Sequence, residues 1–323
     1  MSGGSVPYHL RTNKAIERRI FFDLLGNLAL GRDLKNYKYI SLGGPMLADH
    51  QALHHELGLT KLVSIERDPA VLTRQDFNKP YSCIECWEGS TSDYINNFNE
   101  DDPVIVWLDY TDTKWGSQIN DCVALIENLK EYDIFKVTFN ANPDSLKGNP
   151  AGNELQTFQS KANCTQLSAN LTSNDVSGMD RFALTISEMF KRATEDALGL
   201  DDLEYVPLTQ FRYIDNRHQM LTITGIILPE EDDTSLSTLL SDSHLESWPY
   251  MAQSWLEIQE INVPDITLKE RAEINRYLPC QSQDFDLDVL PFKLDRNARK
   301  AKSKIENYIK YYRFIPNFQR VVG

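Results

Sequence analysis

The stretch Pro103-Val-Ile-Val-Trp-Leu-Asp109, continued by Tyr110-Thr-Asp112, decides the fold class of this chain. Five consecutive apolar residues are typical of a short strand that is buried on both faces, as at the centre of a parallel sheet. The polar residues that follow mark the end of that strand. Parallel neighbours need long crossover connections, so strands that alternate with helices are expected on both sides of this segment.

Such an alternation surrounds the central strand. Apolar runs predict further strands at 37–42, 61–66, 81–87 and 134–139. Apolar residues at helical spacing predict helices at 47–57, 68–77, 90–98 and 116–130. Five strands joined by helices predict a doubly wound, mostly parallel α/β sheet with helices on both faces and right-handed crossovers.

Two more strands are predicted beyond the fifth. Residues 143–177 are polar and rich in Asn, Ser, Gly and Thr, which indicates a loop or lid insertion rather than core. A helix is predicted at 179–198. Strand-like runs at 208–215 and 219–228, separated by a short polar turn, then indicate a β-hairpin that closes the sheet.

Three regions follow from this organisation. An N-terminal helical segment covers 1–36, and the α/β domain covers 37–229. A change of composition after Pro229 marks a mainly helical C-terminal accessory region, 230–323. The candidate helices of the two flanking regions lie at 13–30, 267–277 and 295–312.

The composition is that of an ordinary globular protein. Of the 323 residues, 41% are hydrophobic and 25% charged, which permits a large buried core. No apolar run approaches the roughly 20 residues of a membrane helix, and the first residues do not resemble a signal peptide, so a soluble cytoplasmic protein without membrane contact is expected. The five cysteines are scattered and odd in number, so Cys83 and Cys86 are interpreted as plain strand residues, and no metal site is predicted.

The net charge of −14 argues against sequence-independent binding along a nucleic-acid backbone. The charge is uneven, however, because residues 1–38 carry a net charge of +4 and residues 296–323 one of +7. Two interpretations stay open: the basic ends receive an anionic partner, such as a nucleic acid, or they pack on the acidic body. Most of the aromatic residues interleaved with the C-terminal charges are expected to dock that segment on the body.

The order of these elements resembles that of the class I S-adenosylmethionine-dependent methyltransferases, over residues 37–228. In that family five strand–helix units precede one more helix and a hairpin. The resemblance therefore implies a seven-stranded sheet with an antiparallel last strand. It also implies S-adenosylmethionine as the cofactor, bound beyond the carboxyl ends of the strands.

The first two strand ends carry residues that the resemblance assigns to the cofactor. Gly43 and Gly44 follow the first strand and let the backbone approach a ligand closely. This turn departs from the family pattern, which has an acidic residue in place of Ser41 and a further glycine in place of Pro45. Glu66 ends the second strand, where the family places a carboxylate for the ribose hydroxyls.

The turn after the third strand is the expected adenine pocket of the family. Glu88 or Ser90 is the candidate for hydrogen bonds to the edge of the ring. Trp87 has two interpretations, stacking on the ring or packing in the core.

The turn after the fourth strand carries the candidate catalytic residues, Asp109, Tyr110 and Asp112. It resembles the Asp-Pro-Pro-Tyr motif of amino-methyltransferases, but both prolines are absent. Asp109 has three candidate partners: the ammonium group of the cofactor, an acceptor amine, or a metal. For an oxygen acceptor, Asp109 and Asp112 are the nearest candidates for a general base.

Five residues are candidates for substrate binding. Lys14 and Arg18 lie four residues apart on one helix face, and with Arg11 they are candidates for a clamp on a phosphate or carboxylate. The alternative is a solvated helix face. Asn140 and Asn142 end the fifth strand and either line the acceptor site or only form a turn.

Two functions from different classes remain. The first is a methyltransferase of unknown acceptor, with the basic ends favouring a nucleic acid or nucleotide. The second is a non-catalytic protein that binds S-adenosylmethionine or a nucleotide and works as a sensor or scaffold with a partner protein. A dinucleotide-dependent oxidoreductase is disfavoured, because the G-x-G-x-x-G fingerprint is absent.

Overall fold

The computed structural model describes residues 11–148, 153–199, 202–230 and 233–316. Eight strands form one sheet in the order β3-β2-β1-β4-β5-β7-β6-β8. Strand β7 is antiparallel to its neighbours β5 and β6, and all other pairs are parallel. The strands are β1 (Lys38–Ser41), β2 (Lys61–Glu66), β3 (Ile84–Glu88), β4 (Val104–Asp109), β5 (Ile134–Asn140), β6 (Leu203–Asp215), β7 (His218–Pro229) and β8 (Gln259–Ile261).

This order confirms the predicted fold, a mostly parallel sheet with an antiparallel seventh strand. The sheet is one strand larger than predicted, because the short β8 comes from the C-terminal region and pairs with β6. The helices are α1 (Thr12–Gly31), α2 (Ala48–Leu57), α3 (Pro69–Asn78), α4 (Thr91–Asn96), α5 (Trp115–Ile126), α6 (Glu154–Lys161), α7 (Met179–Leu198), α8 (Asp233–Asp242), α9 (Leu268–Asn275) and α10 (Ala298–Tyr311). No helix within the described ranges is both long and apolar enough to span a bilayer.

Local signals explain where the helices near the carboxyl edge of the sheet begin. Asp68 accepts a hydrogen bond from the Ala70 N–H, and Pro69 occupies the first turn of α3. Ser90 and Asp93 form a capping box at the start of α4. Strands β2 and β3 are parallel neighbours with Glu66 opposite Glu88, so both deliver their last residues to the same edge.

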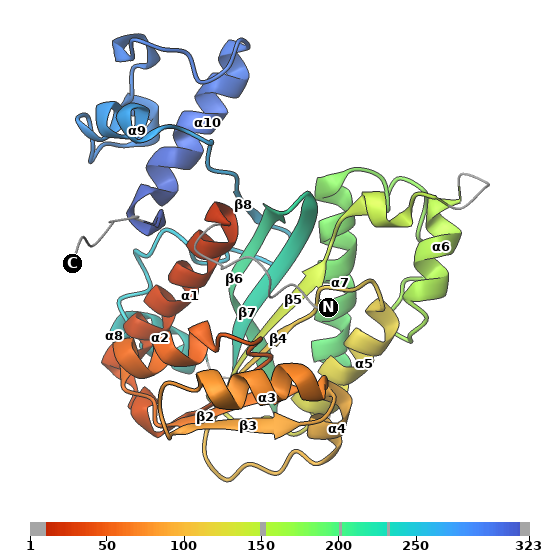
Figure 1. The fold of residues 1–323 in the computed structure, drawn as a ribbon. Coiled ribbons are helices and arrows are strands. Elements are labelled where there is room, and N and C mark those ends of the chain that lie inside the picture. The colour runs from red at the N-terminus through yellow and green to blue at the C-terminus, as the bar shows by residue number, and fades with distance from the viewer. Residues whose placement is uncertain (1–10, 149–152, 200–201, 231–232, 317–323) are drawn as a thin grey trace.

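Different helices cover the two faces of the sheet (Figure 1). Helices α5, α6 and α7 pack on one face, which is apolar and rich in aromatic side chains. Helix α1 packs on the other face, with α2 and α8 beside it. Each strand alternates its side chains between these two cores.

The C-terminal region packs on the first half of α1 and on the hairpin. Tyr308, Tyr311 and Phe314 are buried in a third apolar cluster that includes Ile16 and Ile20 of α1. This burial confirms that these aromatic residues dock the segment on the body. Figure 1 shows α9 and α10 at the end of the molecule beyond β8.

The polar segment 143–177 is more ordered than the predicted loop, where the structure describes it. It contains a short 3₁₀ helix, Pro143–Leu146, and α6. Phe158 of α6 is fully buried, and its ring packs 5.2 Å from those of Trp115 and Phe182. The segment is therefore part of the core on the α7 side, a role that its average composition concealed.

Candidate active site

A cavity of about 390 Å³ opens at the carboxyl ends of strands β1 to β4. The strand order reverses between β1 and β4, and ligands of open α/β sheets bind at such a point. The cavity takes residues from four strand ends, from α5 and from α1. The predicted site residues that line it are Arg11, Lys14, Gly44, Glu66, Ser90, Asp109, Tyr110 and Asp112.

The two glycines of the first turn have different surroundings. Gly44 lines the cavity at a φ of 55°, and its carbonyl accepts a hydrogen bond from the Gln75 side chain at 3.0 Å. Gly43 is buried and does not line the cavity. A Cβ at Gly43 would collide with Ser64 Oγ and lie 2.8 Å from the His50 ring, so this glycine is required by packing beneath the site.

Glu66 and Ser90 line the cavity, and Glu88 does not. The Asp68 N–H donates to Glu66 Oε1 at 2.8 Å, which orients the carboxylate at the end of β2. The Ser90 hydroxyl is held by the capping box with Asp93, at 2.5 Å from Asp93 Oδ2. The exposed Glu88 lies outside the cavity, so its position does not support the predicted adenine contact.

Asp109 is the carboxylate of the cavity that pairs with Lys14. Lys14 Nζ donates to its Oδ2 at 3.1 Å, and its buried Oδ1 has no hydrogen-bond partner among the described residues. Burial by itself raises the pKa of Asp109, but the positive charges of Lys14 and Arg18 outweigh burial and lower the pKa below its ordinary value. Asp109 is therefore ionised, and its Oδ1 can accept a hydrogen bond from a ligand.

Tyr110 belongs to a polar group that the sequence did not predict. Its hydroxyl donates to Asp121 Oδ2 at 3.0 Å, and Ser92 donates to Asp121 Oδ1 at 2.7 Å. Burial raises the pKa of Tyr110 well above its usual value, so the phenol stays protonated. Burial also raises the pKa of Asp121. Ser117 and Asp121, one turn apart on α5, also line the cavity, a placement that the start of a helix just after Asp112 could have indicated.

Asp112 is the exposed carboxylate of the cavity. Its Oδ1 accepts hydrogen bonds from the Gln118 side chain at 2.5 Å and from the Lys114 N–H at 3.2 Å. These bonds hold the turn between β4 and α5. Gln118 and Lys114 line the cavity as well, and neither was predicted.

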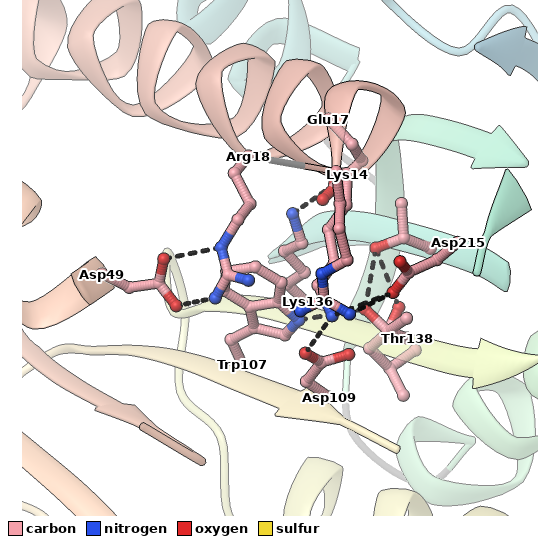
Figure 2. Close-up of polar contacts among 12 residues, drawn as sticks. Lys14, Glu17, Arg18, Asp49, Trp107, Asp109, Lys136, Thr138 and Asp215 are labelled. Atoms are coloured by element: carbon pink, nitrogen blue, oxygen red, sulfur yellow. Dashed lines mark hydrogen bonds and ion pairs between the residues drawn. The ribbon is translucent and has the colours of Figure 1, made fainter. Parts of the chain in front are cut away.

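The three basic residues predicted as a clamp on a phosphate or carboxylate form ion pairs that join the N-terminal end of α1 to the sheet and to α2. Figure 2 shows Lys14 and Arg18 with their carboxylate partners. Arg11 binds Asp215 at 2.8 Å, and Lys14 lies 3.1 Å from Asp109 and 3.8 Å from Asp215. Arg18 forms a two-pronged ion pair with Asp49 and does not line the cavity. The alternative prediction, a solvated helix face, is wrong, because Lys14 and Arg18 are buried.

The same network contains a buried lysine that the sequence did not single out. Lys136 on β5 is fully buried and pairs with Glu17 of α1. Its ammonium lies 4.0 Å from the centre of the Trp107 ring and 4.1 Å from that of Phe21. Burial lowers the pKa of Lys136, and the carboxylate of Glu17 opposes this shift.

Asn140 and Asn142 hold the turns behind the cavity and do not line it. The Asn140 side chain donates to the Thr111 carbonyl at 3.2 Å and accepts from the Asn142 N–H at 3.1 Å. Asn142 caps the following 3₁₀ helix. Their positions agree with the turn interpretation of the sequence.

Comparison with solved structures gives matches at low identity, with TM-scores below 0.5. The plantazolicin methyltransferase BamL in complex with a triazolic desmethylPZN analog and SAH has 12% identity and a TM-score of 0.42, over 67% of this chain and 86% of that chain. Trm1 from Pyrococcus horikoshii, with S-adenosyl-L-methionine, has 11% identity and a TM-score of 0.41, over 67% and 55%. The N-methyltransferase NodS from Bradyrhizobium japonicum WM9 has 12% identity and a TM-score of 0.36, over 66% and 97%.

Sequence comparison identifies the family. No curated protein matches the chain. A family model described as "Putative O-methyltransferase" matches residues 6–323, nearly the whole chain. The match includes the N-terminal helix and the C-terminal region as well as the sheet. The chain therefore belongs to this methyltransferase family, and the order of its strands and helices resembles that of the class I S-adenosylmethionine-dependent methyltransferases.

Proposed function

We propose that the cavity at the ends of β1 to β4 binds S-adenosylmethionine and that the chain transfers the methyl group to an oxygen atom of its acceptor. The observation that carries this proposal is the convergence of Glu66 and Asp109 on one cavity at the switch point of the sheet. The family description supports oxygen as the acceptor atom.

The residues of the cavity fit this ligand. S-adenosylmethionine presents two ribose hydroxyls, a positive sulfur and an amino-acid end that carries both charges. The carboxylate of Glu66 can accept from hydroxyls, and the unpartnered Asp109 Oδ1 can accept from a positive group. The volume of about 390 Å³ lies in the range of cofactor sites.

When bound, the ligand would supply a methyl group on a positively charged sulfur; the acceptor oxygen would form a bond to the methyl carbon as the carbon–sulfur bond breaks in line, which leaves the neutral thioether S-adenosylhomocysteine. The chain contributes mainly orientation and exclusion of water. Asp109, with its lowered pKa, is a weak base and a good partner for a positive group. Asp112 is exposed at the cavity and better placed to take the proton of an acceptor hydroxyl. Tyr110, protonated and bonded to Asp121, shapes the wall.

The charge of α10 supports a nucleic acid or nucleotide as the acceptor. Arg299, Lys302 and Lys310 are exposed on one side of this helix, while its aromatic residues are buried. This arrangement suits contacts to phosphates and leaves no aromatic ring of α10 for stacking on bases.

Calorimetry with S-adenosylmethionine and S-adenosylhomocysteine tests the binding part of the proposal. We expect both ligands to bind, and Glu66→Ala to weaken binding about tenfold or more through loss of charge-assisted hydrogen bonds. Glu85→Ala is the matched control, because Glu85 is exposed on β3 and lies outside the cavity. Absence of binding for both ligands would overturn the proposal.

Release of S-adenosylhomocysteine in the presence of an acceptor pool tests catalysis. We expect release with RNA or nucleotides to fall when Arg299, Lys302 and Lys310 are changed together to Glu, while release with a small phenol does not change. Equal rates of S-adenosylhomocysteine release by the wild type and the triple variant with RNA would show that α10 does not contribute to acceptor binding. Binding without release from any pool would favour a sensor or scaffold.

A further inference from the structure

We propose that the ion pair between Lys14 of α1 and Asp109 of β4 recognises the amino-acid end of S-adenosylmethionine. Asp109 would take the ammonium group and Lys14 the carboxylate. This inference rests on the proposed function and extends it, because it assigns part of the cofactor site to the N-terminal helix.

The end of β1 brings no charged side chain to the cavity. Ser41 is buried and absent from the cavity lining, and the lining residues that follow it are Leu42, Gly44 and Pro45. Strand β4 is hydrogen-bonded to β1, and Asp109 lies at the end of β4 within the cavity. Asp109 therefore provides a negative charge close to the strand that lacks one.

A paired cation and anion match a ligand end that carries both charges. Lys14 and Asp109 both line the cavity, with Nζ and Oδ2 at 3.1 Å. The Lys14 side chain is only 3% exposed, and Asp109 Oδ1 is buried without a partner among the described residues. In a site screened from water, such contacts are stronger than on the surface.

The ion pairs around Lys14 allow Asp109 to bind the ligand without leaving the buried Lys14 ammonium far from any carboxylate. Asp215 lies 3.8 Å from Lys14 Nζ, so Lys14 retains a carboxylate neighbour when Asp109 binds a ligand ammonium. Arg11 binds Asp215 at 2.8 Å and also lines the cavity. The N-terminal end of α1 thus brings two basic residues to the side of the cavity that holds Asp109.

The test compares two ligands that differ only in the amino-acid end. S-adenosylhomocysteine carries it, and 5′-methylthioadenosine lacks it. By calorimetry, we expect Lys14→Met and Asp109→Asn each to weaken S-adenosylhomocysteine about tenfold or more, and to change 5′-methylthioadenosine less than about threefold. The matched control is Lys35→Met, which should change neither affinity, because Lys35 is exposed and lies outside the cavity.

A charge-preserving variant guards against loss of folding. We expect Lys14→Arg to keep most of the preference for S-adenosylhomocysteine, with a thermal melt checked for each variant. Equal losses for both ligands, or no loss for either, would overturn the assignment and leave Lys14 a structural residue. If the wild type binds neither ligand, the proposed function itself fails. If it binds both equally, only the recognition of the amino-acid end fails.

Discussion

The two faces of the sheet bury different chemistry, and β5 shows the contrast residue by residue. Phe135, Val137 and Phe139 point to the face covered by α5 and α7 and join an apolar core. Lys136 and Thr138 point to the face covered by α1 and are as completely buried. Strand β5 therefore contributes apolar side chains to the core on one face and a charged side chain to the interface with α1 on the other face.

The two faces therefore contribute differently to the stability of the fold and to the position of α1. Burial of apolar area stabilises the fold in proportion to the area removed from water. The attraction within a buried ion pair offsets little more than the cost of removing both charges from water. Such pairs therefore add little to the free energy of unfolding. We infer that the ion pairs of α1 fix the place and register of this helix, and with it the distance from Lys14 to Asp109.

The largest effect is expected on the apolar face. The centre of the Phe190 ring on α7 lies 5.9, 6.0 and 5.4 Å from the ring centres of Phe135, Phe139 and Tyr205. Phe190→Ala should lower the free energy of unfolding by about 4 kcal/mol, because it leaves a cavity that a dense core cannot close. Urea denaturation measures this value, and a loss below about 1 kcal/mol would mean that the face is loosely packed.

On the charged face, removal of one partner should differ from removal of both. Glu17→Gln leaves the buried Lys136 without its carboxylate and should cost about 3 kcal/mol. The double variant Glu17→Leu/Lys136→Met should recover most of that loss, since apolar residues of similar size replace buried pairs well. Urea denaturation of all three proteins decides the point. A double variant as unstable as Glu17→Gln would show that the pair itself is a large stabilising force.

A smaller loss is expected at the turn that lies beneath the cavity. Gly43→Ala places a methyl group against Ser64 and His50 and should cost about 2 kcal/mol through overpacking. Gly26→Ala in α1 is the matched control, because its Cβ would meet nothing within 4 Å and the helix should gain up to about 1 kcal/mol. Thermal melts compare the two. Equal stabilities would contradict the packing role of Gly43.

The smallest effect is a dependence of stability on pH. Burial lowers the pKa of His50 in the folded chain, so the unfolded chain binds a proton first as the pH falls below about 6.5. The contribution of neutral His50 is complete above that pH. It is lost toward lower pH with a slope of at most about 1.4 kcal/mol per pH unit.

The matched variant for this dependence is His50→Gln. We expect the difference in unfolding free energy between wild type and variant to shrink as the pH falls from 7 to about 5. Urea denaturation at several pH values measures the unfolding free energy of both proteins. Their difference cancels the contribution of groups that titrate alike in both, such as Asp133, whose pKa burial raises to about 6. A difference that is constant with pH would mean that His50 titrates alike in both states.

The fold was largely predictable because its strands are short, apolar and separated by clear helix starts. The carboxyl ends of parallel strands share one edge, so Glu66 and Asp109 could be placed together from the sequence. The sequence did not predict β8, because three residues carry no periodic pattern. It also did not predict the partners of Arg18 and Lys136, because helical spacing tells which residues share a face and not what lies opposite.

The pairing of β8 with β6 has a consequence for any shortened form of the chain. Strand β6 spans Leu203–Asp215, and β8 covers the hydrogen-bonding groups around Phe211 to Tyr213. A chain cut after Pro229, at the predicted domain boundary, would present a long uncovered edge next to the apolar side chains that Tyr308 and Tyr311 now bury. Such an edge is a template for pairing with another chain, so we expect the shortened chain to self-associate more readily than the full chain.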